Sequence, residues 1–167
     1  RRRAVVVAAL LAASFFWAAW RHGLSLVAVV LSLYALIFVI IACIDIDRHL
    51  ILNRVLGPAA LLALAASFVV PAITPVHALA GGVIGFIIML IPALIMRGGL
   101  GEGDVKLAGF LGLATGYPAV LTALAAGIIL GGVVTGMLLA AGRIGRRQFL
   151  PYGPFLLAGA AIVVLLW

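Results

Sequence analysis

The stretch Gly98-Gly-Leu-Gly-Glu-Gly-Asp-Val-Lys106 places two carboxylates and a run of glycines between two hydrophobic segments. Glu102 and Asp104 are half of the four acidic residues in the chain. The other two, Asp45 and Asp47, also stand together at the end of a hydrophobic run. An ionised carboxylate at such a boundary costs several kcal/mol unless water, a partner or a function keeps it there. The two acidic clusters are therefore the first candidates for a functional site.

The composition indicates a membrane protein. Of the 167 residues, 67% are hydrophobic and 9% are charged, and the mean hydropathy is +1.41. These values lie outside the usual range of soluble globular domains. Apolar runs of about twenty residues recur along the chain, which predicts an all-α polytopic membrane protein without β-sheet. Residues 1–167 are expected to form a single integral-membrane domain.

Seven membrane spans are expected, with a polar loop over 45–57. They are predicted at 4–20, 24–44, 56–73, 76–96, 105–117, 118–141 and 154–167. The segment 105–117 is short, because a helix of this length reaches only about 20 Å against a bilayer core of about 30 Å.

The basic residues decide whether 105–117 crosses. The net charge of +7 alone would also suit a nucleic-acid partner, but the basic residues are spread thinly between the spans, and none is expected. If 105–117 crosses, ten of the eleven basic residues share one side and only Arg21 lies opposite. If it does not cross, the division becomes seven against four. The positive-inside rule therefore favours seven spans, with the Arg1 end and both acidic clusters on the cytoplasmic side.

The carboxylates suggest acid–base chemistry. If the second helix continues through Asp45, Asp47 lies about 200° further round, so one acid of that pair points inward. Asp104 opens the fifth expected helix and Asp45 closes the second, so the helix dipoles are expected to act on them in opposite senses. Two such carboxylates can share one proton and activate a water, as in aspartic proteases.

The glycines support this interpretation. Gly101 and Gly103 would let a substrate backbone pass close to Asp104, although a plain flexible connection between helices is the alternative. A phosphate-binding loop is disfavoured because the stretch lacks the GK[ST] ending. Elsewhere, glycine pairs spaced four apart predict close helix packing: Gly81/Gly85, Gly112/Gly116, Gly127/Gly131 and Gly132/Gly136.

Three segments, in order along nearly the whole chain, carry a resemblance to a known family. Gly101-Glu-Gly-Asp104 resembles a GxGD motif. Ile44-Asp45, followed after five residues by Ile51-Leu-Asn53, resembles the pattern Asp, five residues, then Ile-Pro-Asp or Ile-Pro-Asn, with Leu52 in place of the proline. Pro151-Tyr-Gly-Pro-Phe155 resembles the motif at which the last helix of the same family starts. All three are similar to motifs of the type IV prepilin peptidases, which are membrane aspartic endopeptidases.

The resemblance implies an activity and a location. This family cleaves a short basic leader from prepilin or pseudopilin precursors, ahead of their hydrophobic helix, on the cytosolic face of the prokaryotic inner membrane. Asp45 and Asp104 inherit the catalytic roles, without a metal or another cofactor. Four further residues stand at positions that match the family's motifs. The resemblance implies that they shape the loop or bind substrate: Gly101, Gly103, Lys106 and Asn53.

Bifunctional members of this family also methylate the new amino terminus, through an added cytosolic domain with two CxxC pairs. The chain has one cysteine, Cys43, so no methyltransferase activity is expected of these residues. It starts at Arg1 without a methionine, and we expect it to be part of a longer protein whose upstream region has room for that domain.

Three other classes of protein are alternatives to a prepilin peptidase. A proton-coupled transporter using the same two acids is the main alternative, but broken helices and an internal repeat around mid-bilayer acids are not evident. Presenilin-type proteases pair GxGD with Tyr-Asp, whereas Ile44 precedes Asp45 here. A purely structural membrane subunit is the third. For a zinc site, no histidine or cysteine completes a ligand set, since only His49 lies near the acids.

Overall fold

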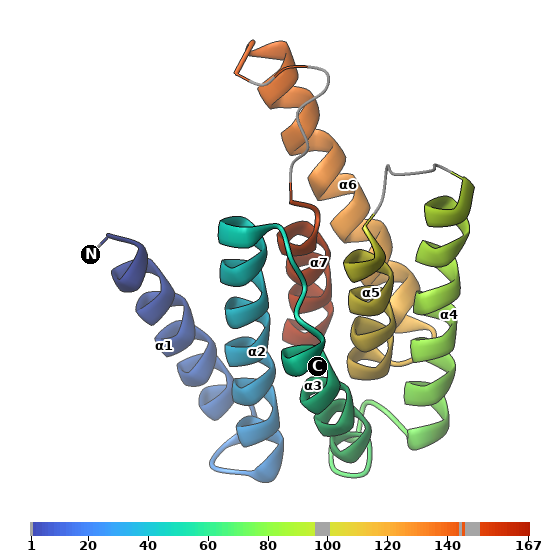
Figure 1. Cartoon of the computed structure of the whole chain (residues 1–167). Helices are drawn as coiled ribbons and strands as arrows, with labels where there is room; N and C mark the ends of the chain where they lie inside the picture. The colour runs from blue at the N-terminus through green and yellow to red at the C-terminus, as the bar shows by residue number, and fades with distance from the viewer. Residues whose placement is uncertain (1, 96–100, 144, 146–150) are drawn as a thin grey trace.

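The structure, a computed structural model, describes residues 2–95, 101–143, 145 and 151–167. These residues form seven helices and no strand. The helices are α1 (Arg2–His22), α2 (Leu26–Arg48), α3 (Asn53–Ala66), α4 (Pro75–Ile95), α5 (Glu102–Thr115), α6 (Ala119–Ala140) and α7 (Gly153–Leu165). Successive helices run in opposite directions along the bundle (Figure 1). The all-α prediction is therefore confirmed for the described residues.

Most of the helices have the composition of membrane spans. Four of the described helices, α1, α2, α4 and α6, are long and apolar enough to cross a membrane, and α3 and α7 are shorter apolar helices. The remaining helix, α5, has 14 residues and so a length of about 21 Å. It packs against α3, α4, α6 and α7, and most of its residues are buried. Because protein surrounds it on most sides, α5 does not need to match the thickness of the bilayer.

The loop predicted over 45–57 is wrong in its extent. Helix α2 continues through Asp45 to Arg48, and only residues 49–52 separate it from α3. His49 ends α2 in the left-handed conformation, with φ 54°, and its N–H donates to the Asp45 carbonyl at 2.8 Å. Polar residues suggested a loop at this position, but the last turn of a helix that leaves a membrane tolerates them. The third span was also placed too late in the chain, since α3 runs over Asn53–Ala66 instead of 56–73.

Glycines set the distance between α4 and α5. A Cβ atom on Gly112 would overlap the carbonyl of Gly81, and one on Gly81 would lie 2.7 Å from the carbonyl carbon of Gly116. Helices α6 and α7 approach in the same way, because a Cβ on Gly127 would lie 2.8 Å from Leu156 Cα. The predicted small-residue packing is thus confirmed at these positions.

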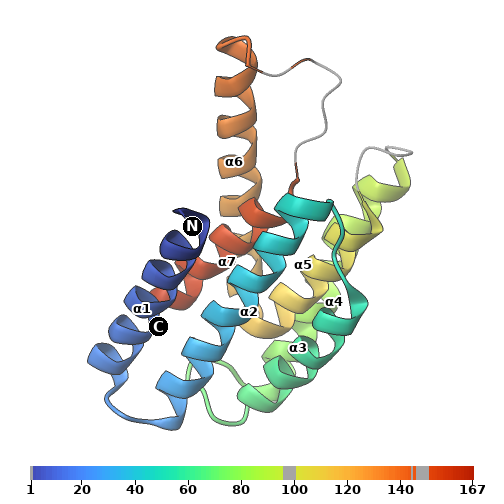
Figure 2. The ribbon, with the colours of Figure 1, turned by 60° about the vertical axis from the view of Figure 1, so that its left-hand side comes forward.

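The pair Gly132/Gly136 does not follow that pattern. No atom lies within 4 Å of a Cβ built on either residue. Both lie toward the end of α6 that extends beyond the other described helices (Figure 2). The four-residue spacing therefore identifies a small-residue face, but whether another helix packs on it depends on the tertiary arrangement.

Candidate functional site

Asp45 and Asp47 lie on opposite faces of the last turns of α2. Asp45 is only 5% exposed, among the buried residues of the bundle. The Asp47 side chain is 56% exposed and pairs with Arg3 of α1, with Nη1 2.6 Å from Oδ1. This division is the one expected from the helical period. Asp45 is therefore the acid of this pair that faces the interior.

The first residue of α7 holds the Asp45 carboxylate. The Gly153 N–H donates to Asp45 Oδ2 at 3.1 Å, across 108 residues of sequence. This N–H belongs to the first turn of α7, where backbone donors have no partner within the helix. A Cβ atom on residue 153 would lie 2.5 Å from the same oxygen. Only glycine therefore lets the carboxylate approach the backbone here.

Asp104 lies in the first turn of α5. Its carboxylate accepts a hydrogen bond from the backbone N–H of Gly101, the N-cap residue. This is one half of a capping box. Since the N-terminus of α7 contacts Asp45 as well, each carboxylate meets the N-terminus of a helix. Asp45 therefore has the N-terminus of α7 as a neighbour in addition to the C-terminal end of α2, a contact that the expectation for the helix dipoles did not include.

A close approach at Gly103 joins α5 to the segment after α2. A Cβ on Gly103 would lie 3.0 Å from Ile51 Cβ, so glycine lets this segment lie against the first turn of α5. Leu52 has φ −78°, close to the value that proline imposes. A proline could therefore adopt the φ angle that Leu52 has here. Gly101 has no such constraint, because its φ is −74° and the nearest atom to a Cβ would be 3.5 Å away.

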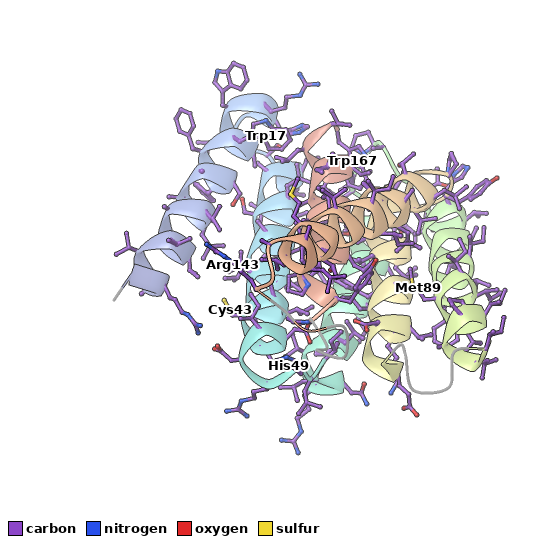
Figure 3. All side chains as sticks on the ribbon, turned by 90° about the horizontal axis from the view of Figure 1, so that it is seen from above. Trp17, Cys43, His49, Met89, Arg143 and Trp167 are labelled. Carbon is purple, nitrogen blue, oxygen red and sulfur yellow. The ribbon has the colours of Figure 1, made fainter. Side chains whose placement is uncertain are left out.

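These elements enclose a cavity of about 320 Å³ at the end of the bundle where α2 stops and α5 starts. It contains both candidate acids, whose carboxylates lie close enough to interact electrostatically. All six residues singled out from the sequence line it. The described residues that line it are Asp45, His49, Leu50, Ile51, Asn53, Gly101, Glu102, Gly103, Asp104 and Lys106. Seen from this end of the bundle, His49 lies at the end of α2 (Figure 3).

Two neighbours of the site were not singled out from the sequence as site residues. His49 lines the cavity and lies near Asp45. Tyr152 precedes α7 and donates from its hydroxyl to the Ile128 carbonyl at 3.2 Å. Burial, together with the nearby Asp104 carboxylate, raises the pKa of Tyr152. The motif containing Tyr152 was recognisable, but its position beside Asp104 depends on how α7 packs in the bundle.

The arrangement offers a buried carboxylate and a half-buried one that line the same cavity. In the part of the chain that the structure describes, no group of three or more His, Cys, Asp or Glu side chains gathers to hold a metal ion. One ionised and one protonated carboxyl group can remove a proton from water and donate another to a carbonyl oxygen. The cavity therefore has the groups that hydrolysis of a peptide bond requires.

The comparisons with known proteins point to the same part of the chain. The model of the type IV leader peptidase family matches residues 31–136, which is more than half of the chain and includes both Asp45 and Asp104. The chain belongs to the type IV leader peptidase family. The resemblance seen in the three motifs is thereby confirmed.

Two curated relatives within this leader peptidase family are bacterial. The prepilin leader peptidase/N-methyltransferase of Bacillus subtilis (strain 168) is 31% identical over 145 residues, covering 87% of this chain and 58% of that protein. The prepilin leader peptidase/N-methyltransferase of Pseudomonas putida is 28% identical over 154 residues, covering 89% and 53%. The chain thus spans a little more than half the length of these relatives. No solved structure matches it.

Proposed function

We propose that this chain is a membrane-embedded aspartic endopeptidase that removes the short basic leader from prepilin-like precursors. One observation carries the proposal: Asp45 and Asp104, from α2 and α5, line a single cavity at one end of an apolar helical bundle. Membership of the type IV leader peptidase family supports the reaction class. The names of the two relatives support a prepilin as the substrate.

In the proposed mechanism, one carboxylate is ionised and the other carries a proton. The ionised group takes a proton from the water as its oxygen attacks the scissile carbonyl carbon, and the protonated group gives its proton to the carbonyl oxygen. The tetrahedral intermediate then collapses and the C–N bond breaks. The leaving nitrogen receives a proton from the first carboxyl group, and a hydroxyl group of the intermediate returns a proton to the second carboxylate as the new carbonyl forms. Gly153 contributes by fixing the Asp45 carboxylate with its backbone N–H.

Asn53, Gly101, Gly103 and Lys106 surround the two acids in this proposal. Gly103 shapes the site by letting the segment around Ile51 lie on α5. Asn53 and Lys106 are exposed side chains at the cavity, where an amide and an ammonium group can hydrogen-bond an extended substrate backbone. The direct test is co-expression with a prepilin, where the intact chain is expected to convert the precursor to a shorter form on a gel. An unchanged precursor in the presence of well-expressed protein would contradict the proposal.

The active site is proposed to face the cytosol of a prokaryotic inner membrane. In a Cys43→Ala background, we expect Arg143→Cys to react with a membrane-impermeant maleimide only after the cells are opened. Tyr117→Cys, at the opposite end of the bundle, is expected to react in intact cells. We expect this orientation because the basic residues are concentrated at the end of the bundle that holds both acids, and basic residues favour the cytosolic side.

Labelling of both positions after permeabilisation is the control for accessibility. Reaction of Arg143→Cys in intact cells, with Tyr117→Cys protected, would place the proposed site outside the cytosol. Reaction of both positions in intact cells would contradict a seven-span topology.

A further inference from the structure

A groove of about 520 Å³ lies between α4 and α5. Its wall on α4 is entirely apolar and includes Phe86, Leu90 and Leu94. These three residues are spaced four apart, so they share one face of the helix and extend about 12 Å along its axis. Among the residues that the structure describes, the lining is Phe86, Leu90, Ala93, Leu94, Glu102, Val105 and Lys106.

The groove adjoins the cavity that holds Asp45 and Asp104. Glu102 and Lys106 line both spaces. They are separated by about one turn of α5, and both are exposed. The border between groove and cavity is therefore a single helical turn with a negative and a positive side chain.

The position of the groove determines what can occupy it. Its α4 wall belongs to a helix that is long and apolar enough to span a membrane. In the hydrocarbon region, a polypeptide must satisfy its backbone hydrogen bonds internally, which here means an apolar helix. At Glu102 and Lys106 the surface becomes polar, so the same chain can leave the helix and continue in extended form toward the carboxylates. A lipid tail would match the apolar wall but would make no use of the polar side chains between the groove and the cavity.

We propose that this groove binds the transmembrane helix of the substrate and thereby presents the adjoining peptide to Asp45 and Asp104. The proposal rests on the proposed function and adds where the substrate enters: sideways from the membrane, between α4 and α5. Glu102 and Lys106 then flank the extended segment between the bound helix and the scissile bond.

Crosslinking tests the docking without requiring turnover. Leu94 lines the groove and is 69% exposed, whereas its neighbour Ile95 is 74% exposed and does not line it. Adjacent helical residues point about 100° apart, so the two form a matched pair. The Cys43→Ala background removes the one native cysteine, which lies on the side of α2 near α1, away from α4 (Figure 3). Asp104→Asn keeps the substrate uncut.

The probe is a prepilin that carries one cysteine in its apolar helix, scanned over four successive positions. Leu94→Cys is expected to form a disulfide with at least one of these positions, at a yield several times that of Ile95→Cys. Equal yields from the two variants, or a higher yield from Ile95→Cys, would overturn the proposal.

Kinetics separates this proposal from the proposed function. Filling the groove with Leu94→Trp is expected to raise the KM for the intact prepilin by about tenfold, with kcat little changed, because ground-state binding is lost. Ile95→Trp is the control and should behave like the unmodified chain. A peptide with the cleavage site but without the apolar helix should be cut equally by both variants. Unchanged KM in Leu94→Trp, with normal cleavage, would overturn the docking proposal alone. Absence of cleavage by the unmodified chain would overturn both proposals.

Discussion

Asp104→Asn and Asp45→Asn are each expected to abolish cleavage of a co-expressed prepilin, by about a thousandfold or more, since a single carboxyl group cannot act as general acid and general base in the same step. An asparagine amide cannot exchange a proton with the attacking water at the pH of the cell. The two carboxylates line one cavity and interact electrostatically. When either is replaced by asparagine, the remaining acid has no partner with which to share a proton.

The other two acids of the chain are the matched controls. Asp47 pairs with Arg3 on the far face of α2, and Glu102 lies exposed at the edge of the cavity. Asp47→Asn and Glu102→Gln are expected to retain much of the activity. Near-normal cleavage by Asp104→Asn would remove the aspartic mechanism. Loss of activity in Asp47→Asn together with full activity in Asp45→Asn would assign the role in the reaction to Asp47 instead of Asp45.

Gly153→Ala is expected to reduce prepilin cleavage by about a hundredfold, the order that a displacement of about 1 Å in a reacting group produces. The added methyl group would lie 2.5 Å from Asp45 Oδ2. The carboxylate must then move away and lose the Gly153 N–H, its hydrogen-bond donor from α7. The measurement is kcat/KM of purified variant and parent in detergent, with helicity and elution volume compared to show that the fold is retained.

Gly132→Ala is the control for a glycine-to-alanine change in the same bundle. A Cβ on Gly132 meets no atom within 4 Å, and alanine is the better helix former. It is expected to leave cleavage unchanged. A Gly153→Ala variant that folds and cleaves normally would show that the contact between α7 and Asp45 has no role in the reaction. A shifted pH profile with some remaining activity would support the positioning role, because a change confined to folding stability leaves that profile where it was.

The helices were predictable from the sequence because apolar runs and their lengths are local properties. The placement of Asp45 and Asp47 on different faces followed from the helical period. The structure agrees, because α2 continues through both residues to Arg48. The end of α2 was misplaced because polar residues occur both in loops and in the last turn of a helix that leaves a membrane. His49 ends the helix in the left-handed conformation, but in a sequence a histidine predicts a helix end less strongly than a glycine does.

The contacts that complete the site were beyond prediction from the sequence. The hydrogen bond from Gly153 to Asp45 joins residues 108 positions apart, and neither residue alone indicates its partner. The motif around Gly153 was recognised by resemblance, but its physical reason appears only when α7 is placed against α2. Gly132/Gly136 show the reverse case, since their spacing predicted packing at a surface where the bundle supplies no partner.

Cleavage of a purified prepilin by the purified chain in detergent, with excess EDTA and across a range of pH, tests the two-carboxylate mechanism most directly. We expect full activity in the chelator and a bell-shaped pH profile. At low pH both carboxyl groups are protonated and no base remains, whereas at high pH both are ionised and no acid remains. The two apparent pKa values of the profile would belong to the pair. Loss of activity in EDTA, with recovery on adding Mg²⁺ or Ca²⁺, would contradict the mechanism.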